Sequence, residues 1–402
     1  MEKTSLKQFI PEKYLYLTKT KKIIYKGINI KTDYLINIIN ELIIKYYFHK
    51  EDLIDREVKF NMWSKLLRVK YGSKYNYYID YLIEQGFMFL VSDYYKNKKS
   101  RTYKLNVGDL IHIKKCSIND TILLKKSSKE YLKKTFLYYN NSTIDVDIRE
   151  KLVDNLYDIN LDTNSARKYM DNLRDTREIS YNKYMKNIIS IDNIESNNIF
   201  FKFDEYGRMH TNFTILRKYL RQNYITIDNS IIDEVDLSNS QPLFLTVLMK
   251  EEMPVKKLFS KSVSRYIDLV QNGLIYEELV HKCGFIHKYG LESRNQAKIM
   301  MYKVLFGTNG DTKKENKMFY ELFPTVFEFI KEYKLVNNNY KTLSHRLQLL
   351  ESDFIFNKVI KHLYKSNPDI KLFTVHDSIC YPIKYKNDVR EVFNYYRKNL
   401  LN

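Results

Sequence analysis

The chain has 402 residues and a formal charge of +19, from 67 lysines and arginines against 48 acidic residues. The length allows two or three domains, and the charge favours a polyanionic partner, nucleic acid before a membrane surface. AT-rich coding, which enriches lysine, asparagine, isoleucine and tyrosine, is a second source of this charge. No stretch is long and uncharged enough to span a bilayer, no signal sequence is expected, and three scattered cysteines predict no disulfide framework. We therefore expect a cytoplasmic protein with no membrane partner.

Residues 1–115 predict a nucleic-acid-binding region that opens with a packing helix from residue 32. Further on, a helix is expected around 61–69, and a second helix, capped by Ser73, extends through Gln85. Two strands, 87–95 and 100–105, then surround a basic loop. Helix, turn, helix and basic hairpin is the winged-helix arrangement, which we predict at 55–106. Its phosphate-contacting side chains would be Lys96, Lys98, Lys99 and Arg101. A generic α+β subdomain with a solvated lysine loop is the alternative.

Residues 116–197 predict a helical, thumb-like region whose helices begin near Ser128, Asp147 and Asn164. The third of these helices carries a row of basic side chains, Arg167, Lys168, Arg174 and Arg177. This row could follow a nucleic-acid backbone, but a solvated helix face is the favoured interpretation.

The pattern changes from about residue 198, where three stretches carry clustered polar residues. An apolar strand over 231–237 ends at Asp236, and the apolar runs 372–375 and 379–383 predict a hairpin with Asp377 at its tip. Between them, residues 293–307 predict one helix. Its side chains at four-residue steps, Arg294, Lys298, Tyr302 and Phe306, form a row of roughly 18 Å.

These side chains suit phosphoryl transfer to a 3′-hydroxyl from a nucleoside triphosphate. Two Mg²⁺ ions, for which Mn²⁺ can substitute, would need carboxylates from different strands, and Asp236 and Asp377 meet that need. The carbonyl oxygen of Leu237 is a further candidate ligand. Arg294 and Lys298, one turn apart, would hold the phosphates. Tyr302 and Phe306 would offer a flat surface to sugar and base.

The three stretches resemble motifs A, B and C of the superfamily of family A DNA polymerases and phage-type single-subunit RNA polymerases. The stretch Asp236-Leu-Ser238 with Gln241 resembles motif A. The helix residues Arg294, Lys298, Phe306 and Gly307 resemble motif B, and His376-Asp377-Ser378 resembles motif C. The resemblance covers roughly 200–402 and implies an α+β fold, a right-hand palm with an antiparallel sheet and helical fingers, over 198–402. It implies catalytic roles for Asp236, Asp377 and Lys298, and a nucleotide pocket that includes Gln241. It also implies primer–template contacts from Arg208, His210, Arg217, Arg221, Gln348 and His376.

Three departures from the motifs bear on the product. Gln241 keeps the bulk of the glutamate that excludes a ribose 2′-hydroxyl, and Phe306 lacks the usual phenolic hydroxyl, so both favour deoxynucleotides. Ser378 instead matches the RNA polymerases. We expect a DNA-dependent DNA polymerase without a proofreading exonuclease, from a phage or mobile element replicating in a bacterial host cytoplasm. The alternatives are an RNA polymerase or primase of the same superfamily, and a DNA-binding replication initiator with an inactive palm.

Overall fold

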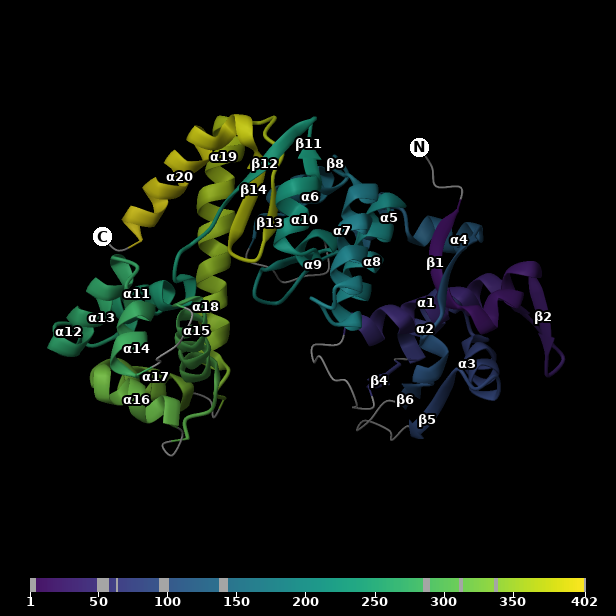
Figure 1. Cartoon of the computed structure of the whole chain (residues 1–402), viewed down its shortest axis with the longest axis horizontal. Helices are drawn as coiled ribbons and strands as arrows, with labels where there is room; N and C mark the ends of the chain where they lie inside the picture. Colours follow the sequence, from purple (N-terminus) through teal and green to yellow (C-terminus); the bar gives the residue numbers. More distant parts are fainter. Residues whose placement is uncertain are drawn as a thin grey trace. The chain divides into compact units, whose positions relative to one another are not determined.

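The computed structural model describes residues 5–48, 58–62, 64–93, 101–136, 144–284, 290–310, 314–335 and 339–400 (Figure 1). The chain divides into two compact units, each assembled from separate stretches. Unit 1 comprises Met1–Thr135, Leu161–Phe200 and Ile215–Tyr224, and unit 2 comprises Phe136–Asn160, Phe201–Thr214 and Ile225–Asn402. Both combine helices with small antiparallel sheets, which is an α+β architecture in its general form.

The units do not follow the boundaries expected at residues 115 and 197. The region 116–197, expected as one thumb-like domain, is divided, because residues 136–160 pack with unit 2 and 161–200 with unit 1. Residues 215–224, expected within the palm and fingers, belong to unit 1. The two units therefore differ from the expected division, since the chain passes between them several times.

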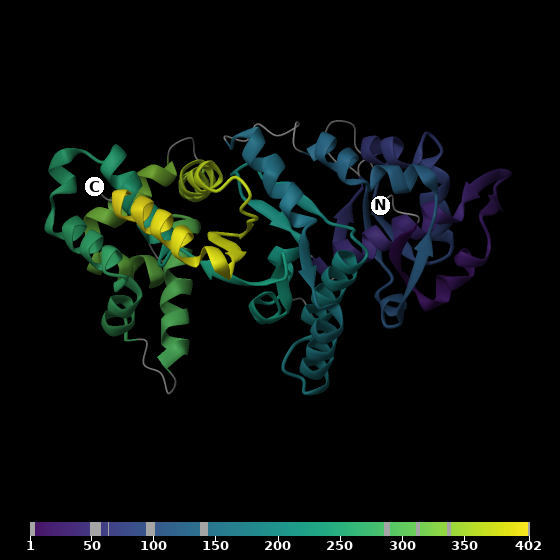
Figure 2. The same ribbon diagram turned by 90° about the horizontal axis from the view of Figure 1, so that it is seen from above.

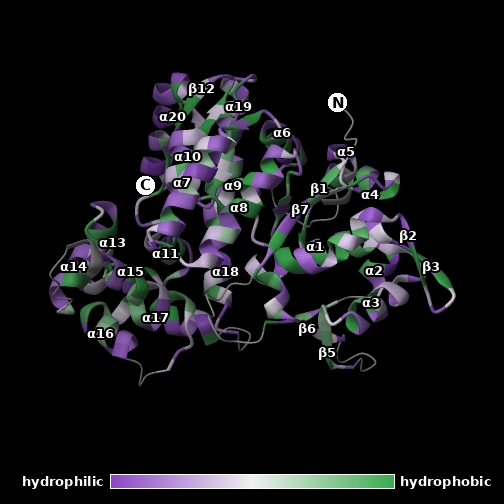
Figure 3. Cartoon of the chain, turned by 45° about the vertical axis from the view of Figure 1, so that its right-hand side comes forward, coloured by the Kyte–Doolittle hydropathy of each residue, from purple (hydrophilic) through white to green (hydrophobic). Residues whose placement is uncertain are grey.

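The centre of unit 1 is a two-stranded antiparallel sheet covered by a buried helix. Strand β1 (Leu6–Pro11) pairs with β7 (Ile113–Ile118), and α1 (Thr32–Phe48) packs on β1. Because α1 is buried on most of its surface, its apolar residues extend beyond one stripe, and it is largely green in Figure 3. The other elements of this unit are η1 (Glu12–Lys19), β2 (Lys22–Tyr25), β3 (Ile28–Lys31), η2 (Val107–Leu110), α4 (Thr121–Lys126), α5 (Lys129–Phe136), α7 (Thr163–Asp175), α8 (Tyr181–Glu195) and α10 (Lys218–Tyr224).

After α1 the chain forms a small helix-and-sheet subdomain. Its elements are β4 (Lys59–Asn61), α2 (Ser64–Tyr71), α3 (Tyr75–Glu84), β5 (Met88–Ser92) and β6 (Thr102–Leu105). The strand order is β4-β6-β5, with both pairs antiparallel. The helix expected around 61–69 begins later because residues 59–61 pair with β6. Lys96, Lys98 and Lys99 lie outside the described residues, whereas Arg101 donates to Asp93 over 2.9 Å.

Helix α7 begins one residue before the position expected from the sequence, because the side chain of Asp162 caps it by accepting from the backbone N–H of Ser165. Two arginines of the basic row are paired within unit 1: Arg167 with Asp192 and Glu195, and Arg174 with Asp171 and Asp175. These ion pairs agree with the interpretation of the row as an ordinary helix face.

Unit 2 is built on a five-stranded sheet in the order β13-β14-β12-β11-β8. These strands are β8 (Ile159–Leu161), β11 (Ile225–Ile227), β12 (Ser230–Val235), β13 (Phe373–Val375) and β14 (Ser378–Pro382). A separate hairpin pairs β9 (Phe201–Phe203) with β10 (Met209–Thr211). The remaining elements before the long helix are α6 (Val146–Leu156), α9 (Asn212–Ile215), α11 (Ser240–Glu252), α12 (Val255–Leu258), α13 (Lys261–Gln271), α14 (Ile275–Lys282), α15 (Gly290–Phe306), α16 (Lys314–Leu322) and α17 (Pro324–Leu335).

One long helix of unit 2 contains α18 (Thr342–Ser352), the π-helical segment η4 (Asp353–Ile360) and α19 (Lys361–Ser366). The last helix, α20 (Lys386–Asn399), follows η5 (Ile383–Tyr385) and packs against η4 and α19. Figure 2 looks along the long helix, with α20 beside it. Among the described residues, no helix has the length and apolar composition needed to cross a bilayer.

Candidate functional site

The pairing of β12 with β14 brings the two candidate metal-binding aspartates to one end of the sheet. Val235 pairs with Ile379, so Asp236, which follows Val235, and Asp377, two residues before Ile379, leave the paired strands at the same end. The β13–β14 hairpin closes with a two-residue turn, because Val375 pairs with Ser378 and only His376 and Asp377 lie between them. His376 holds the left-handed φ of 57° that such a tight turn requires and is exposed. Two stretches about 140 residues apart in sequence therefore place their carboxylates together.

Asp377 lies among like charges. Burial, then the charges of Glu351 and Asp236, raise the pKa of its carboxyl to about 6, while the Arg208 guanidinium acts in the opposite direction. A carboxylate that is partly desolvated and faces other carboxylates is unstable as an anion unless a cation approaches. Carboxyls with raised pKa values cluster at functional sites, which makes Asp377 a candidate functional acid.

Glu351 is the acid at the centre of this site that the sequence analysis missed. It is only 2% exposed, on α18, and its carboxylate accepts hydrogen bonds from the Arg208 Nε at 2.9 Å and the Gln241 Nε2 at 2.6 Å. The Ser240 hydroxyl donates to the same carboxylate. The sequence does contain a signal, since Glu351 lies four residues after the buried Leu347, on the inward side of the helix. A charge inside an apolar stripe is seldom there for packing alone.

Arg208 reaches Glu351 because a glycine lets the β9–β10 hairpin approach α18. Gly207 has a φ of +81°, and a Cβ at this position would lie 3.1 Å from the Cβ of Ser352. The carboxylate of Asp204 holds the turn by accepting from the backbone N–H groups of Tyr206 and Arg208. It also bonds the His210 Nε2 at 2.8 Å. The segment expected to contact primer and template is thus a rigid hairpin next to the aspartates.

The helix α15 presents its predicted row toward the same site. Burial, followed by the charges of Asp377 and Glu351, raises the pKa of the Tyr302 hydroxyl. The Tyr302 and Phe306 rings stack with centroids 5.5 Å apart and an angle of 11° between planes. Tyr302 remains 44% exposed, so the stacked pair offers an accessible aromatic surface beside the carboxylates.

The two cations of the row lie over a tyrosine of α14. The Arg294 guanidinium is 5.2 Å and the Lys298 amine 5.8 Å from the ring centroid of Tyr276. Burial, and among other charges that of Asp377, raises the pKa of Tyr276, so this ring links the cations to the carboxylates. Arg294 also donates to Glu277 over 2.7 Å, a half-exposed ion pair that is weak in water. A triphosphate could therefore take over this guanidinium at small cost.

Gly307 ends α15 for a steric reason. A Cβ at this position would lie 2.4 Å from the carbonyl oxygen of Lys303, which is closer than a side chain tolerates. The buried Lys334 donates to the carbonyl oxygens of Gly307, at 2.8 Å, and of Val304. The last turn of the helix is thereby capped by a cation, which the helix dipole favours.

Some of the predicted contacts lie elsewhere. Arg217 and Arg221 belong to unit 1, whereas the aspartates belong to unit 2. Arg221 is only 7% exposed and donates to the carbonyl oxygen of Leu216, which gives its guanidinium a partner within the unit. Gln348 is half-buried on α18, one turn before Glu351.

The donor set fits magnesium better than a tightly caged metal. Within the described ranges, no group of three or more His, Cys, Asp or Glu residues is arranged to hold a metal ion. Mg²⁺ commonly binds one or two protein carboxylates and completes its shell with waters and substrate phosphates. Asp236 and Asp377, with their unfavourable mutual charge, match that pattern, and the Leu237 carbonyl is a third possible oxygen. The saturated carboxylate of Glu351 is not a candidate ligand.

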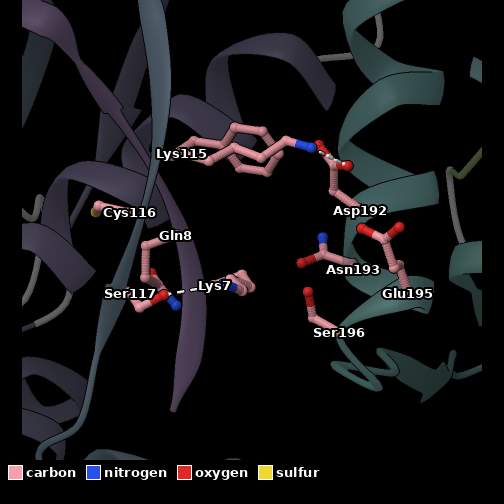
Figure 4. Close-up of a pocket in the computed structure, with 10 residues that line it drawn as sticks. Lys7, Gln8, Lys115, Cys116, Ser117, Asp192, Asn193, Glu195 and Ser196 are labelled. Atoms are coloured by element: carbon pink, nitrogen blue, oxygen red, sulfur yellow. Dashed lines mark hydrogen bonds and ion pairs between the residues drawn. The ribbon is translucent and has the colours of Figure 1, made fainter.

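A cavity of about 210 Å³ in unit 1 contains none of the predicted site residues (Figure 4). It lies between β1, β7 and α8, and Lys115 reaches across it to Asp192. Asp192 is 3% exposed and also accepts from Arg167. Since both signs of charge meet here within the protein, the cavity is a polar junction between sheet and helix.

Comparison with models of known protein families finds no match to this chain, and comparison with curated protein sequences finds none either.

Proposed function

We propose that the chain is a template-directed nucleotidyltransferase, specifically a DNA-dependent DNA polymerase without proofreading, whose palm and fingers lie in unit 2. The observation that carries the proposal is the pairing of β12 with β14, which places Asp236 and Asp377 together beside Glu351, Arg208 and Tyr302. The motif resemblance named the two aspartates, Arg208 and Tyr302 from separate stretches, and their common neighbourhood supports it. Glu351 is added by the geometry.

Each group has a role in this proposal. Two Mg²⁺ ions bound by Asp236 and Asp377 would supply charge neutralisation for the attacking and leaving oxygens. Lys298 and Arg294 bind the triphosphate, and the Tyr302–Phe306 pair positions sugar and base. Arg208, oriented by Glu351, and His210 hold the primer terminus, with His376 and Gln348 nearby. Because the chemistry depends on positioning and charge, the rigid hairpin and the capped α15 are as necessary as the carboxylates.

Gln241 supports a deoxynucleotide substrate. Its amide nitrogen donates to Glu351 over 2.6 Å, and the side chain is 5% exposed. A bulky side chain fixed in this way cannot easily move aside for a 2′-hydroxyl. An RNA polymerase or primase is the alternative within the same chemistry, because Ser378 matches that form of motif C.

Primer extension with Mg²⁺ and either dNTPs or rNTPs tests the proposal. We expect extension with dNTPs by the unmodified chain and loss of extension in Asp377→Asn and Asp236→Asn. Asp353→Asn, a half-exposed acid further along the long helix, is the matched control and should extend normally. Extension by Asp377→Asn at the normal rate would refute the mechanism. Extension by the unmodified chain with rNTPs but not with dNTPs would identify an RNA polymerase instead of a DNA polymerase.

A second candidate function is a DNA-binding replication initiator, and the subdomain after α1 favours it. Helix α1, strand β4, helices α2 and α3, and strands β5 and β6, paired in the order β4-β6-β5, follow the winged-helix arrangement. Tight duplex binding by the full chain without any extension, unchanged in Asp377→Asn, would favour the initiator. Both functions share nucleic acid as partner.

A further inference from the structure

Unit 2 contains a groove on the side of the long helix where α20 packs. It encloses about 510 Å³ and is lined by residues of η4, α19 and α20: Asn357, Lys358, Lys361, His362, Lys365, Ser366 and Tyr396. Three lysines and no acid line it. A concave surface of one sign concentrates counter-ions more strongly than the same charges on a flat face.

The lysines of this groove are only weakly neutralised by the protein. The Lys358 amine is 3.8 Å from Asp353, and the Lys361 amine is 3.8 Å from Asp145. Both pairs are half-exposed and at the outer limit of an ion pair, so each contributes little in water. Lys365 forms no ion pair with another described residue. These cations are therefore available to an external anion at small cost.

The remaining side chains of the groove are polar or aromatic. His362 and Tyr396 meet edge to face with centroids 5.7 Å apart, and the His362 Nδ1 is 3.3 Å from the Tyr396 hydroxyl. No exposed aliphatic side chain lines the groove, whereas a membrane-binding surface usually presents apolar residues for insertion. Amines around a polar and aromatic floor suit a phosphodiester chain better.

The groove and the candidate site share one helix. Lys365 is fourteen residues after Glu351, which corresponds to roughly 20 Å along a helix axis. Lys361 and Lys365 are one turn, about 6 Å, apart, which is close to two nucleotide steps of a strand at 3.4 Å per step. A strand that passes the aspartates would reach the groove several nucleotides away.

We infer that the groove of Lys358, Lys361 and Lys365 between the long helix and α20 binds the phosphate backbone of a nucleic-acid strand, a second contact that rests on the proposed function. The contact is independent of sequence, because lysines bind phosphates as point charges. It anchors the strand on the same rigid helix that carries Glu351.

Salt-dependent binding of the full chain to a fluorescent oligonucleotide tests this inference without requiring catalysis. The triple variant Lys358→Ala, Lys361→Ala, Lys365→Ala should reduce the slope of log K against log salt by about 2 to 3, as expected for three lost phosphate contacts. The matched control Lys256→Ala, Lys261→Ala, Lys282→Ala removes the same charge from exposed positions of unit 2 outside the groove and should change the slope by less than about 1. Equal slopes for the two triple variants would overturn the inference.

Lysine acetylation of the unmodified chain, read by mass spectrometry with and without the oligonucleotide, gives a second measurement. Lys358, Lys361 and Lys365 should be protected by single-stranded or primed DNA, whereas protection by anionic vesicles and not by DNA would assign the groove to a membrane and refute the inference. If the unmodified chain fails to extend primers but the groove is protected, the polymerase proposal fails and the groove remains. If extension succeeds and the groove is unprotected, only the groove is wrong.

Discussion

Asp192 of unit 1 and Asp377 of unit 2 show two ways in which this chain surrounds a buried carboxylate. Asp192 accepts from Lys115 and Arg167, so its charge is balanced within the fold. Asp377 instead faces Glu351 and Asp236, and Arg208, a cation that acts against them, is already bound to Glu351. The first arrangement supports packing, and the second leaves an unbalanced negative charge that an external cation would neutralise. Substitution should therefore have opposite effects on stability at the two positions.

The largest effect on stability is expected for Asp192→Ala. Removing this carboxylate takes a buried partner from both Lys115 and Arg167, although Arg167 keeps Glu195, and breaking a buried pair costs about 3 kcal/mol. Thermal and urea unfolding should show unit 1 destabilised by roughly this amount. The neighbouring Asn193→Ala, which loses only the hydrogen bond that its amide oxygen accepts from Asn198, should cost much less. Equal loss of stability in the two variants would contradict the special role given to the Asp192 charge.

For Asp377→Asn we expect the opposite sign. The folded pKa of about 6 is above the ordinary value of 3.8, so ionisation of Asp377 destabilises the fold. The variant should be more stable by about 1–3 kcal/mol above pH 6, at 1.36 kcal/mol per pKa unit, in the absence of divalent ions. The difference should shrink as the pH falls through 6 and vanish below about 4, where both side chains are neutral. Melting temperatures measured across this range check the sign, and a destabilised variant at pH 8 would contradict it.

Glu351→Gln should alter kinetics more than folding. The amide keeps the shape but loses the charge that holds Arg208 and orients Gln241, and losing a charge-assisted hydrogen bond costs roughly 1.5 kcal/mol, about tenfold. We expect about tenfold lower kcat/KM and weaker preference for dNTPs over rNTPs in primer extension. Ser352→Ala, on the same turn, is the control. Unchanged sugar preference in Glu351→Gln would mean that Glu351 does not orient the nucleotide site.

The smallest effect is expected for Gly307→Ala. The added Cβ would meet the Lys303 carbonyl oxygen at 2.4 Å and loosen the last turn of α15, at a cost of about 1 kcal/mol. A small fall in melting temperature with a several-fold rise in KM for nucleotide would agree with this cause. Gly108→Ala, where a Cβ has room, should do neither.

The local elements of unit 2 follow from the sequence. Apolar runs gave β13 and β14, and the spacing of Arg294, Lys298, Tyr302 and Phe306 gave α15, because hydrophobic periodicity and tight turns are short-range properties. Contacts between residues far apart in sequence could not be predicted from these local patterns. Glu351 could not be assigned, because its partners, Arg208 and Gln241, lie more than a hundred residues away. The division of 116–197 between two units was missed for the same reason.

The exact helix starts and the burial of single charged side chains were also not predicted from the sequence. Helices α6 and α7 are capped by Asp145 and Asp162, each one or two residues before the expected start, since several polar residues there compete as caps. Arg221 was predicted to contact primer and template, and its burial could not be foreseen, since its hydrogen bond to a backbone carbonyl depends on the local fold. Charge in a sequence gives no direct sign of burial.

Binding of Mn²⁺, counted by electron paramagnetic resonance in the presence of dNTP and a primed template, tests the central comparison most directly. The account predicts that the unmodified chain and Asp192→Asn bind the ion alike, whereas Asp236→Asn and Asp377→Asn lose it. Equal Mn²⁺ binding by all four proteins would show that the paired aspartates of unit 2 do not hold divalent ions.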